Sequence, residues 1–339
     1  MANTIHYFIN SNSAKGFVSF YKSNFGLLDQ VIQLDNYPSI IAEELIGRIS
    51  AFATEKGYRQ EIIHSCLDNC AEGIILPQLK TGLLNIPAYI DHGYSVYRLM
   101  KQEEIVQTQQ LLAKAQEYFA QALKIHDDWE RIYIQNLNFA KMNQLTSDTI
   151  LKLLGGHTQN QKGSAVKRLF GASTVSGPVD YIENITADIE KRYFIKGRPG
   201  TGKSTFLKKV AERAVNNGYR VEIYHCAFDP NSLDLVVVRD LGLCLFDSTA
   251  PHEYFPSREG DELIDIYQEA VNADTDETHK GELDQIQTEY RAMVAKAIES
   301  LNQANRAYQT YEDSILSKID SESCKRSIQK IMTKLLKIK

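Results

Sequence analysis

The 339-residue sequence is poor in several features that mark specialised classes of protein. Its five cysteines are an odd number spread over a long chain, which argues against a framework of disulfides. It contains no uninterrupted apolar run of about 18 residues, so we expect no membrane-spanning helix and no membrane partner. Its net charge is only −5, which argues against a nucleic-acid partner.

The first residues, MANTIHYFINSNSAKG, lack the basic start and the apolar run of a signal peptide. We therefore expect a cytoplasmic protein. Hydrophobic residues make up 43% of the chain and charged residues 24%, a balance typical of a folded globular protein. The length is sufficient for two domains of ordinary size.

One short segment, HSCLDNC, brings three possible zinc ligands together, namely His64, Cys66 and Cys70. No second pair of ligands follows at a useful spacing. Free cysteines are often buried as small apolar side chains, so we favour buried thiols at the end of a strand over a zinc site.

A long-range repeat is the most informative feature of the sequence. GYRQEIIHSC, which begins at Gly57, matches GYRVEIYHC, which begins at Gly218, at an offset of 161 positions (218 − 57). The same offset places NYPSIIAEE on GRPGTGKST, and one inserted residue places EGIILPQLKTGLLN on DLVVVRDLGLCLFD. We interpret the repeat as an internal duplication.

Each half shows the same order of short apolar strands and one helix, followed by a long polar helical segment. This alternation predicts an α/β fold made of two duplicated P-loop NTPase-like domains, each a mainly parallel sheet with flanking helices. The linker around LLGGHTQNQKGSAVKR places the domains at residues 1–160 and 161–339.

The segment GRPGTGKS fits the phosphate-binding pattern G-x-x-x-x-G-K-[ST]. An apolar strand precedes it and a helix follows, so backbone amides and the helix N-terminus would surround a phosphate. Lys203 would neutralise the β- and γ-phosphates of ATP, and Ser204 would bind Mg²⁺. The predicted binding residues are Gly197, Arg198, Pro199, Gly200, Thr201, Gly202, Lys203, Ser204 and Thr205.

Such a site also needs a carboxylate beside the magnesium ion, at the end of an apolar strand. Asp247 in LCLFD is the best candidate, and Asp240 in VVVRD is the alternative. A purely structural role for Asp247 would be to begin the turn DSTAP.

Asp229 follows the third strand of the second half, where it could activate an acceptor hydroxyl as a catalytic base or merely cap the turn before Pro230. Because its counterpart Asp68 is also an aspartate, a structural role stays open. Glu253 is a weaker candidate for orienting a water molecule. Arg258 could approach the γ-phosphate, although a solvated loop arginine is the simpler interpretation.

The first half has lost every charged element of this pattern. The replacements are Asn36 for Gly197, Ile41 for Gly202, Ala42 for Lys203, Glu43 for Ser204 and Asn85 for Asp247. A carboxylate at position 43 would repel phosphate. We therefore expect one working site, in the second half.

FIKGRPGTGKSTFLKK, GYRVEIYHCAFDPNSLD and LFDSTAPHEYFPSREGDELIDIY resemble a family of bacterial tandem P-loop ATPases of uncharacterised role. The resemblance covers nearly all of both halves and implies nucleotide binding and ATPase-like activity. In that family the first half commonly keeps its own phosphate-binding loop, and this chain departs from it at 36–43.

Three functions fit these observations. The chain could be a Mg²⁺-dependent ATPase, a small-molecule or nucleotide kinase with Asp229 as the base, or an ATP-gated interaction protein with little turnover. ATP is favoured by default, because the nearest guanine-recognition string, SKID at 317–320, follows no convincing strand. The sequence does not identify a second substrate or a protein partner.

Overall fold

The computed structural model describes residues 4–35, 37–90 and 103–336. The strands are β1 (Thr4–Phe8), β2 (Asn10–Ser13), β3 (Gly16–Ser19), β4 (Gln30–Asp35), β5 (Gln60–His64), β6 (Ala71–Leu76), β7 (Thr81–Ile86), β8 (Ser164–Leu169), β9 (Gly171–Thr174), β10 (Gly177–Asp180), β11 (Lys191–Lys196), β12 (Arg220–His225), β13 (Leu233–Val238), β14 (Leu243–Asp247) and β15 (Asp261–Asp265). The helices are α1 (Tyr21–Phe25), α2 (Ser39–Glu55), α3 (Glu103–Gln135), α4 (Phe139–Leu154), α5 (Ile182–Ile185), α6 (Lys203–Asn216), α7 (Ile266–Ala270), α8 (Thr275–Thr278), α9 (Lys280–Leu316) and α10 (Ser321–Leu336), with short 3₁₀ helices η1 (Pro77–Leu79) and η2 (Arg239–Leu241).

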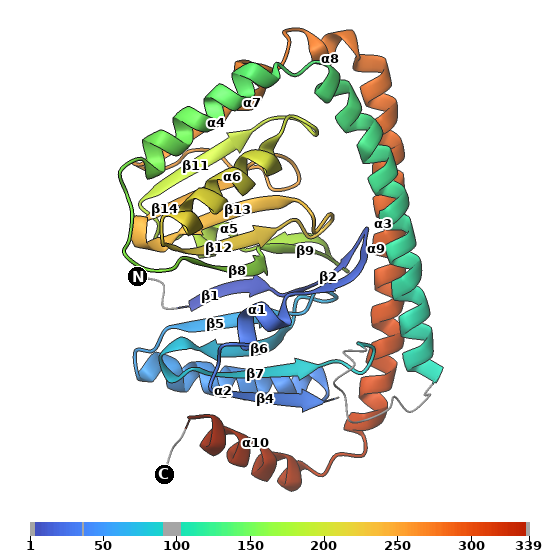
Figure 1. The fold of residues 1–339 in the computed structure, drawn as a ribbon. Coiled ribbons are helices and arrows are strands. Elements are labelled where there is room, and N and C mark those ends of the chain that lie inside the picture. Colours follow the sequence, from blue (N-terminus) through green and yellow to red (C-terminus); the bar gives the residue numbers. More distant parts are fainter. Residues whose placement is uncertain (1–3, 36, 91–102, 337–339) are drawn as a thin grey trace.

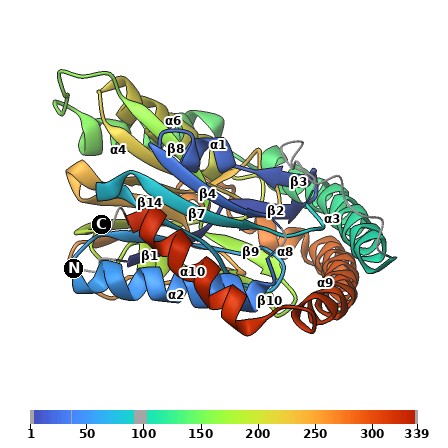
Figure 2. The same cartoon turned by 90° about the horizontal axis from the view of Figure 1, so that it is seen from below.

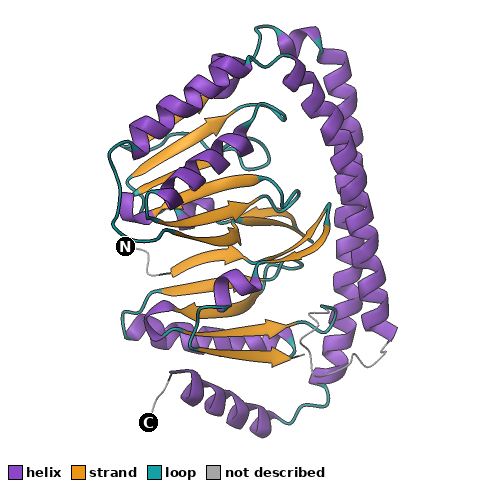
Figure 3. Cartoon of the chain, viewed as in Figure 1, coloured by secondary structure: helices purple, strands orange, loops and turns teal. Residues whose placement is uncertain are grey.

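The predicted α/β class is confirmed, but the strands of the two halves do not form two separate sheets. One 11-stranded sheet has the order β15-β11-β14-β13-β12-β8-β1-β5-β6-β7-β4, with helices on both sides (Figures 1 and 3). The halves are continuous because β1 and β8 meet at one antiparallel pair, Phe8 with Leu169.

The prediction of mainly parallel sheets holds only in part, because the sheet is mixed: β11 pairs in parallel with β14 and β15, β12 with β8, β1 with β5 and β4 with β7. β12, β13 and β14 are antiparallel neighbours, as are β5, β6 and β7. The chain between β12 and β13 spans only 226–232, and η2 alone joins β13 to β14. Such short connections suit antiparallel strands, whereas parallel neighbours need a longer crossover.

Within the single sheet, the strand order β4-β7-β6-β5-β1 of the first half recurs as β11-β14-β13-β12-β8 in the second. Local details recur as well. β5 has an irregular register at His64 and β12 has one at His225, which lies 161 positions later (225 − 64). Gly57 and Gly218, which follow α2 and α6, both have positive φ angles. The repeat seen in the sequence therefore corresponds to matching local structure.

Two helices, α4 from the first half of the chain and α10 from the second, each cover strands of the other half. Met142 and Leu154 of α4 pack in the core beneath α6, with residues such as Phe206. Ile328 and Leu335 of α10 pack in the core beneath α2. Figure 2 shows the two pairs on opposite sides, with α4 and α6 on one side and α2 and α10 on the other. The boundary predicted near residue 160 falls between α4 and β8.

The long helices α3 and α9 lie along each other in opposite directions beside the sheet (Figure 1). Leu112 and Phe119 of α3 share a buried cluster with Leu301 and Tyr308 of α9. The apolar stripes of these otherwise polar helices are thus buried against each other and against the sheet. No helix in residues 4–35, 37–90 and 103–336 combines the length and apolar character that crossing a membrane requires.

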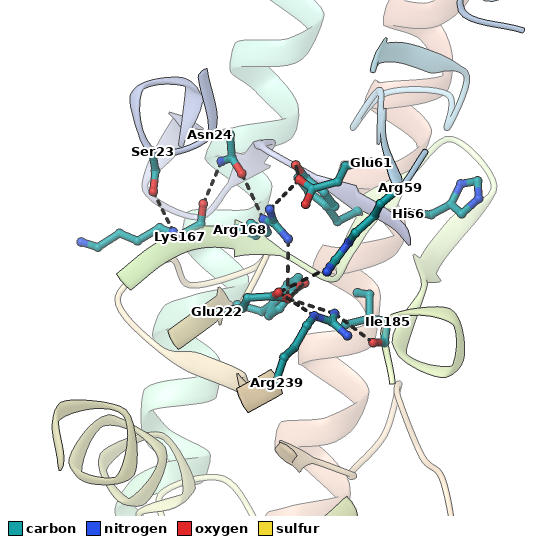
Figure 4. A network of polar contacts seen from close by, with 12 residues as sticks. His6, Ser23, Asn24, Arg59, Glu61, Lys167, Arg168, Ile185, Glu222 and Arg239 are labelled. Atoms are coloured by element: carbon teal, nitrogen blue, oxygen red, sulfur yellow. Dashed lines mark hydrogen bonds and ion pairs between the residues drawn. The ribbon is translucent and has the colours of Figure 1, made fainter. Parts of the chain in front are cut away.

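A buried network of charged side chains joins the halves where β1 meets β8 (Figure 4). Arg168 of β8 is 3% exposed, and its Nη2 lies 2.6 Å from Glu61 Oε2 while its Nη1 lies 3.5 Å from Glu222 Oε2. The Tyr7 ring stacks on the guanidinium, with the ring centroid 4.2 Å from the guanidinium carbon. Arg239 Nε lies 2.7 Å from Glu222 Oε1. The network connects strands of both halves through one guanidinium.

Candidate functional site

The loop between β11 and α6 has the backbone geometry of an anion-binding turn. Gly200 and Gly202 have φ angles of +76° and +90°, which residues other than glycine rarely adopt. A Cβ atom on Gly197 would lie 2.6 Å from Thr201 Oγ1. The buried Thr201 hydroxyl donates to the Arg198 carbonyl at 2.8 Å and closes the loop. The predicted strand, loop and helix are therefore all present.

Lys203, the first residue of α6, is buried at the centre of this loop. Its Nζ donates to the Arg198 carbonyl at 2.9 Å and lies 3.6 Å from Asp247 Oδ2. The Ser204 hydroxyl accepts a hydrogen bond from the Leu233 N–H at 2.9 Å, so it faces the start of β13. The loop thus brings a cation, a hydroxyl and a carboxylate together.

Asp247 ends β14 next to β11, where it is paired in register with Ile195. Its Oδ1 accepts hydrogen bonds from the Thr249 N–H and hydroxyl at 3.1 and 2.6 Å, so it also begins the turn as the structural interpretation expected. The alternative, Asp240, lies in η2 before β14 begins and is therefore at the other end of that strand. The structure favours Asp247 as the carboxylate beside the loop.

A second carboxylate, Asp234 of β13, was not predicted from the sequence. Burial and the nearby charge of Asp247 raise the pKa of Asp234 to about 7. The repeat contained a signal for it, because Glu72 occupies the matching position in EGIIL. Burial and the charge of Asp68 likewise raise the pKa of Glu72 to about 8. An acidic side chain thus occupies this position in both halves.

Glu130 of α3, also missed, lies directly against the loop. Its backbone approaches so closely that a Cβ atom on Gly200 would lie 2.5 Å from the Glu130 carbonyl oxygen. The Gly200 amide favours the charged form of the Glu130 carboxyl, and this effect opposes the larger effects of burial and of Asp127. Burial and the neighbouring charge of Asp127 raise the pKa of Glu130. No local pattern in the sequence indicates this contact, because the two residues are far apart in the chain.

Glu130 belongs to a polar group with His126 and Asp127, whose potential metal-ligating atoms all lie within 4.8 Å of one another. It is the one such group of three in the part of the chain that the structure describes. Burial and the charge of Lys203 lower the pKa of His126. The same lysine charge disfavours a second cation, so we regard this group as the polar rim of the site.

The side chain of Arg198 has one acidic and one aromatic partner outside the loop. Its Nη2 lies 2.8 Å from Asp276 Oδ2, and its guanidinium carbon lies 5.0 Å from the Tyr267 ring centroid. Tyr133 of α3 donates to the other oxygen of Asp276 at 2.7 Å. These contacts connect the loop to α3 and α8. Thr205 is exposed on α6.

The other predicted residues divide into those near the loop and those remote from it. The charge of Asp229 acts on both His126 and Glu130, so Asp229 lies near the rim, where it accepts from the Asn231 N–H and the Ser232 hydroxyl at 3.2 Å each. Glu253 pairs with Lys196 at 3.0 Å. Arg258 donates to the Thr186 and Ala187 carbonyls, before β11 begins, and so is remote from the loop.

In the first half, the matching positions serve packing. Ile41 and Ala42 are buried, and Glu43 Oε1 accepts from the Ala71 N–H at 3.1 Å. Asn85 Nδ2 donates to the Tyr37 carbonyl at 3.0 Å. Asn36, the predicted counterpart of Gly197, lies outside the described residues.

The space beside these first-half residues is small. A cavity of about 10 Å³ lies between Ser39, Asp68, Glu72 and Asn85, enough for about one water molecule. Ser39 donates to Glu312 Oε1 of α9 at 2.8 Å from both its N–H and its hydroxyl. This cavity is too small for a phosphate group.

At His64, Cys66 and Cys70 the structure favours unligated thiols over the zinc alternative, with Cys66 buried as expected but Cys70 only half-buried. Both ring nitrogens of His64 have partners, since Nδ1 lies 2.8 Å from the Asn69 carbonyl and Nε2 lies 2.9 Å from His6 Nδ1. Burial raises the pKa of both thiols, which disfavours the thiolate form that zinc binds.

No family model, curated protein or solved structure matches this chain. The resemblance to tandem P-loop ATPases therefore stays a prediction from the sequence. What supports a function is the arrangement of side chains around the β11–α6 loop.

Proposed function

We propose that this chain is a Mg²⁺-dependent nucleoside triphosphatase with one working site, the loop at 197–204, and that ATP is its substrate. One observation carries the proposal: a buried lysine at the start of α6 lies beside a strand-end carboxylate, within a loop shaped by left-handed glycines. Outside a ligand site this arrangement is unfavourable, because a buried ammonium loses its hydration.

The residues present fit a triphosphate. The amides of the loop and the free N–H groups at the start of α6 form a cradle that would close on phosphate oxygens. Gly197, Gly200 and Gly202 leave that cradle free of side chains. Lys203 would move from the Arg198 carbonyl to the phosphates, where its charge counters theirs.

The residues present also fit Mg²⁺, which prefers oxygen ligands. Ser204 would bind the ion directly, and Asp247, with Asp234 beside it, would hold the water molecules around it. A bound Mg²⁺ neutralises charge on the phosphates as the terminal bond breaks. The protein's own part is to hold the phosphates, orient the hydroxyl and carboxylates, and limit the access of water.

Support for ATP over GTP is indirect. SKID at 317–320 follows the end of α9, close to Glu312, and Glu312 contacts the first half rather than the loop. The guanine-recognition string is therefore remote from the proposed site. We propose further that both halves derive from one P-loop-type unit and that the first half has lost nucleotide binding.

Of the two alternatives, the kinase has less support. Both carboxylate oxygens of Asp229 already accept hydrogen bonds within its own turn, as those of a turn-capping residue do. The ATP-gated interaction protein has a specific observation in its favour, because α3 contacts the loop directly through Glu130 and Gly200. It differs from the ATPase only in turnover.

The test compares wild type with Lys203→Ala and with Lys208→Ala, a matched loss of charge at an exposed position of the same helix. Isothermal titration with Mg²⁺ and a nonhydrolysable ATP analogue measures affinity, and phosphate release measures turnover. Lys203→Ala should lose about 1.5–3 kcal/mol of binding free energy, the usual worth of a hydrogen bond to a charged group. Lys208→Ala should bind as wild type does. Equal affinity in all three proteins would refute the proposal.

A further inference from the structure

A helix glutamate lies at the matching loop position at both ends of the long helix pair. In the second half, the backbone of Glu130 on α3 lies against Gly200, where a Cβ atom would lie 2.5 Å from the Glu130 carbonyl oxygen, and the Gly200 amide favours the charged form of the Glu130 carboxyl. In the first half, the Ser39 N–H donates to the carboxylate of Glu312 on α9 at 2.8 Å. Ser39 and Gly200 are separated by the repeat offset of 161 positions (200 − 39). A helix glutamate therefore lies at the corresponding loop position in each half, and in the first half it accepts a hydrogen bond from the loop amide.

The two contacts differ in strength. Glu312 also accepts a hydrogen bond from the Ser39 hydroxyl, at 2.8 Å. Gly200 has no side chain to add such a bond. The Glu130 side chain is also 39% exposed, so water competes for it. The first-half contact between Ser39 and Glu312 is thus the stronger of the two.

We propose that Glu130 occupies an anion position of the 197–204 loop in the nucleotide-free protein, and that the incoming triphosphate displaces it. The inference rests on the proposed function and concerns the regulation of that site. One amide cannot donate fully to both a carboxylate and a phosphate oxygen. The two anions also repel each other in a confined site.

Displacement of Glu130 would release one end of α3 from the loop. The corresponding end of α9 stays attached to the first half, because Glu312 and Ser39 have no nucleotide competing for them. Nucleotide binding would then shift the end of α3 relative to α9. The adjoining Tyr133 contact with Asp276 provides a direct connection from this movement to Arg198 in the loop.

The experiment measures the affinity of full-length variants for the nonhydrolysable ATP analogue with Mg²⁺. Glu130→Ala should bind about tenfold more tightly than wild type, because the competing acceptor is gone. The matched control, Glu312→Ala, should bind as wild type does. Unchanged or weaker binding by Glu130→Ala would overturn the inference.

Hydrogen exchange gives a second measurement that needs no variant. Adding the analogue to wild type should speed exchange at the amides of 126–135 and leave those of 308–316 unchanged. Slower or equal exchange at 126–135 would contradict the displacement of α3.

The outcomes also separate this inference from the proposed function. If wild type binds and Lys203→Ala does not, but Glu130→Ala gains no affinity, only the displacement is wrong. If wild type and Lys203→Ala bind equally, the proposed function fails. Loss of turnover in Glu130→Gln at unchanged affinity would assign Glu130 to catalysis and likewise overturn displacement.

Discussion

The loops after β4 and β11 occupy corresponding places in one sheet, yet their side chains have opposite surroundings. In the second half, Lys203 is buried beside Asp247 and Ser204 faces β13. In the first half, the corresponding Ala42 is buried among apolar side chains, and Asn85 is hydrogen-bonded to the backbone. β4 pairs with β7 in the same register as β11 pairs with β14, although β11 also pairs with β15 and β4 lies at the edge of the sheet.

The difference separates what the fold requires from what a ligand requires. Apolar side chains at 41 and 42 stabilise the first half, so the fold itself does not need a lysine or a hydroxyl there. Buried charges are costly unless they are paired, and the ion pair of Lys203 with Asp247 is long, at 3.6 Å. The second half keeps groups that stabilise it poorly, and a bound triphosphate would offset that cost.

The largest expected effect tests whether the halves are independent. Arg168→Met leaves Glu61 and Glu222 without their shared cation, and we expect a loss of about 3–5 kcal/mol in the free energy of unfolding. Urea unfolding followed by circular dichroism measures it. Lys167→Met, a matched change at the exposed neighbouring residue, should cost little. A loss below about 1 kcal/mol would show that the network does not hold the halves together.

A second prediction uses pH on the same network. Burial alone would raise the pKa of Glu222, but the charges of Arg168 and Arg239 lower it from 4.5 to about 2. Its contribution to stability is therefore present above pH 4.5 and lost as the pH falls toward 2. The loss should reach roughly 3 kcal/mol.

Unfolding free energies measured between pH 5 and 2.5 check this prediction, with Glu222→Gln as the comparison. The variant should show a shallower dependence on pH than wild type. Glu55→Gln, at an exposed position, is the control and should keep the wild-type slope. Parallel curves for wild type and Glu222→Gln would contradict the assignment.

A smaller effect compares the two strand-end positions directly. Asp247→Asn should lower Mg²⁺-dependent turnover about tenfold, because it weakens the hold on the ion by about 1.4 kcal/mol, and should affect nucleotide binding less. Phosphate release at varied Mg²⁺ concentrations measures this. The reciprocal change, Asn85→Asp, should give no second site by titration. A binding stoichiometry of two would show that the first half needs only this carboxylate.

Much of the local structure could be predicted from the sequence. The pattern GRPGTGKS fixed a strand, a loop and a helix, and LCLFD placed Asp247 at a strand end beside them. The repeat offset correctly matched Gly57 with Gly218. These features depend on short segments whose spacing and glycines restrict the backbone directly.

The features that were missed depend on which distant segments pack together. An apolar stripe on α3 or α10 indicates a buried face but not the partner that covers it. No short segment of the sequence therefore indicates the contact between Glu130 and Gly200. Nor does one indicate that α4 covers the second half of the sheet and α10 the first. The antiparallel strands were different, because the short connections at 226–232 and 239–242 could have revealed them.

Because α4 covers the second half of the sheet and α10 covers the first, the two cores can close only in a certain order during translation. α4 leaves the ribosome before the strands it covers, so the core between α4 and α6 can close once β14, β15 and α7 have emerged. The apolar surface of α2, in contrast, waits for α10, which is made after both β-rich segments. The N-terminal half is therefore synthesised first and completed last, and the apolar face of α2 stays uncovered in the interval.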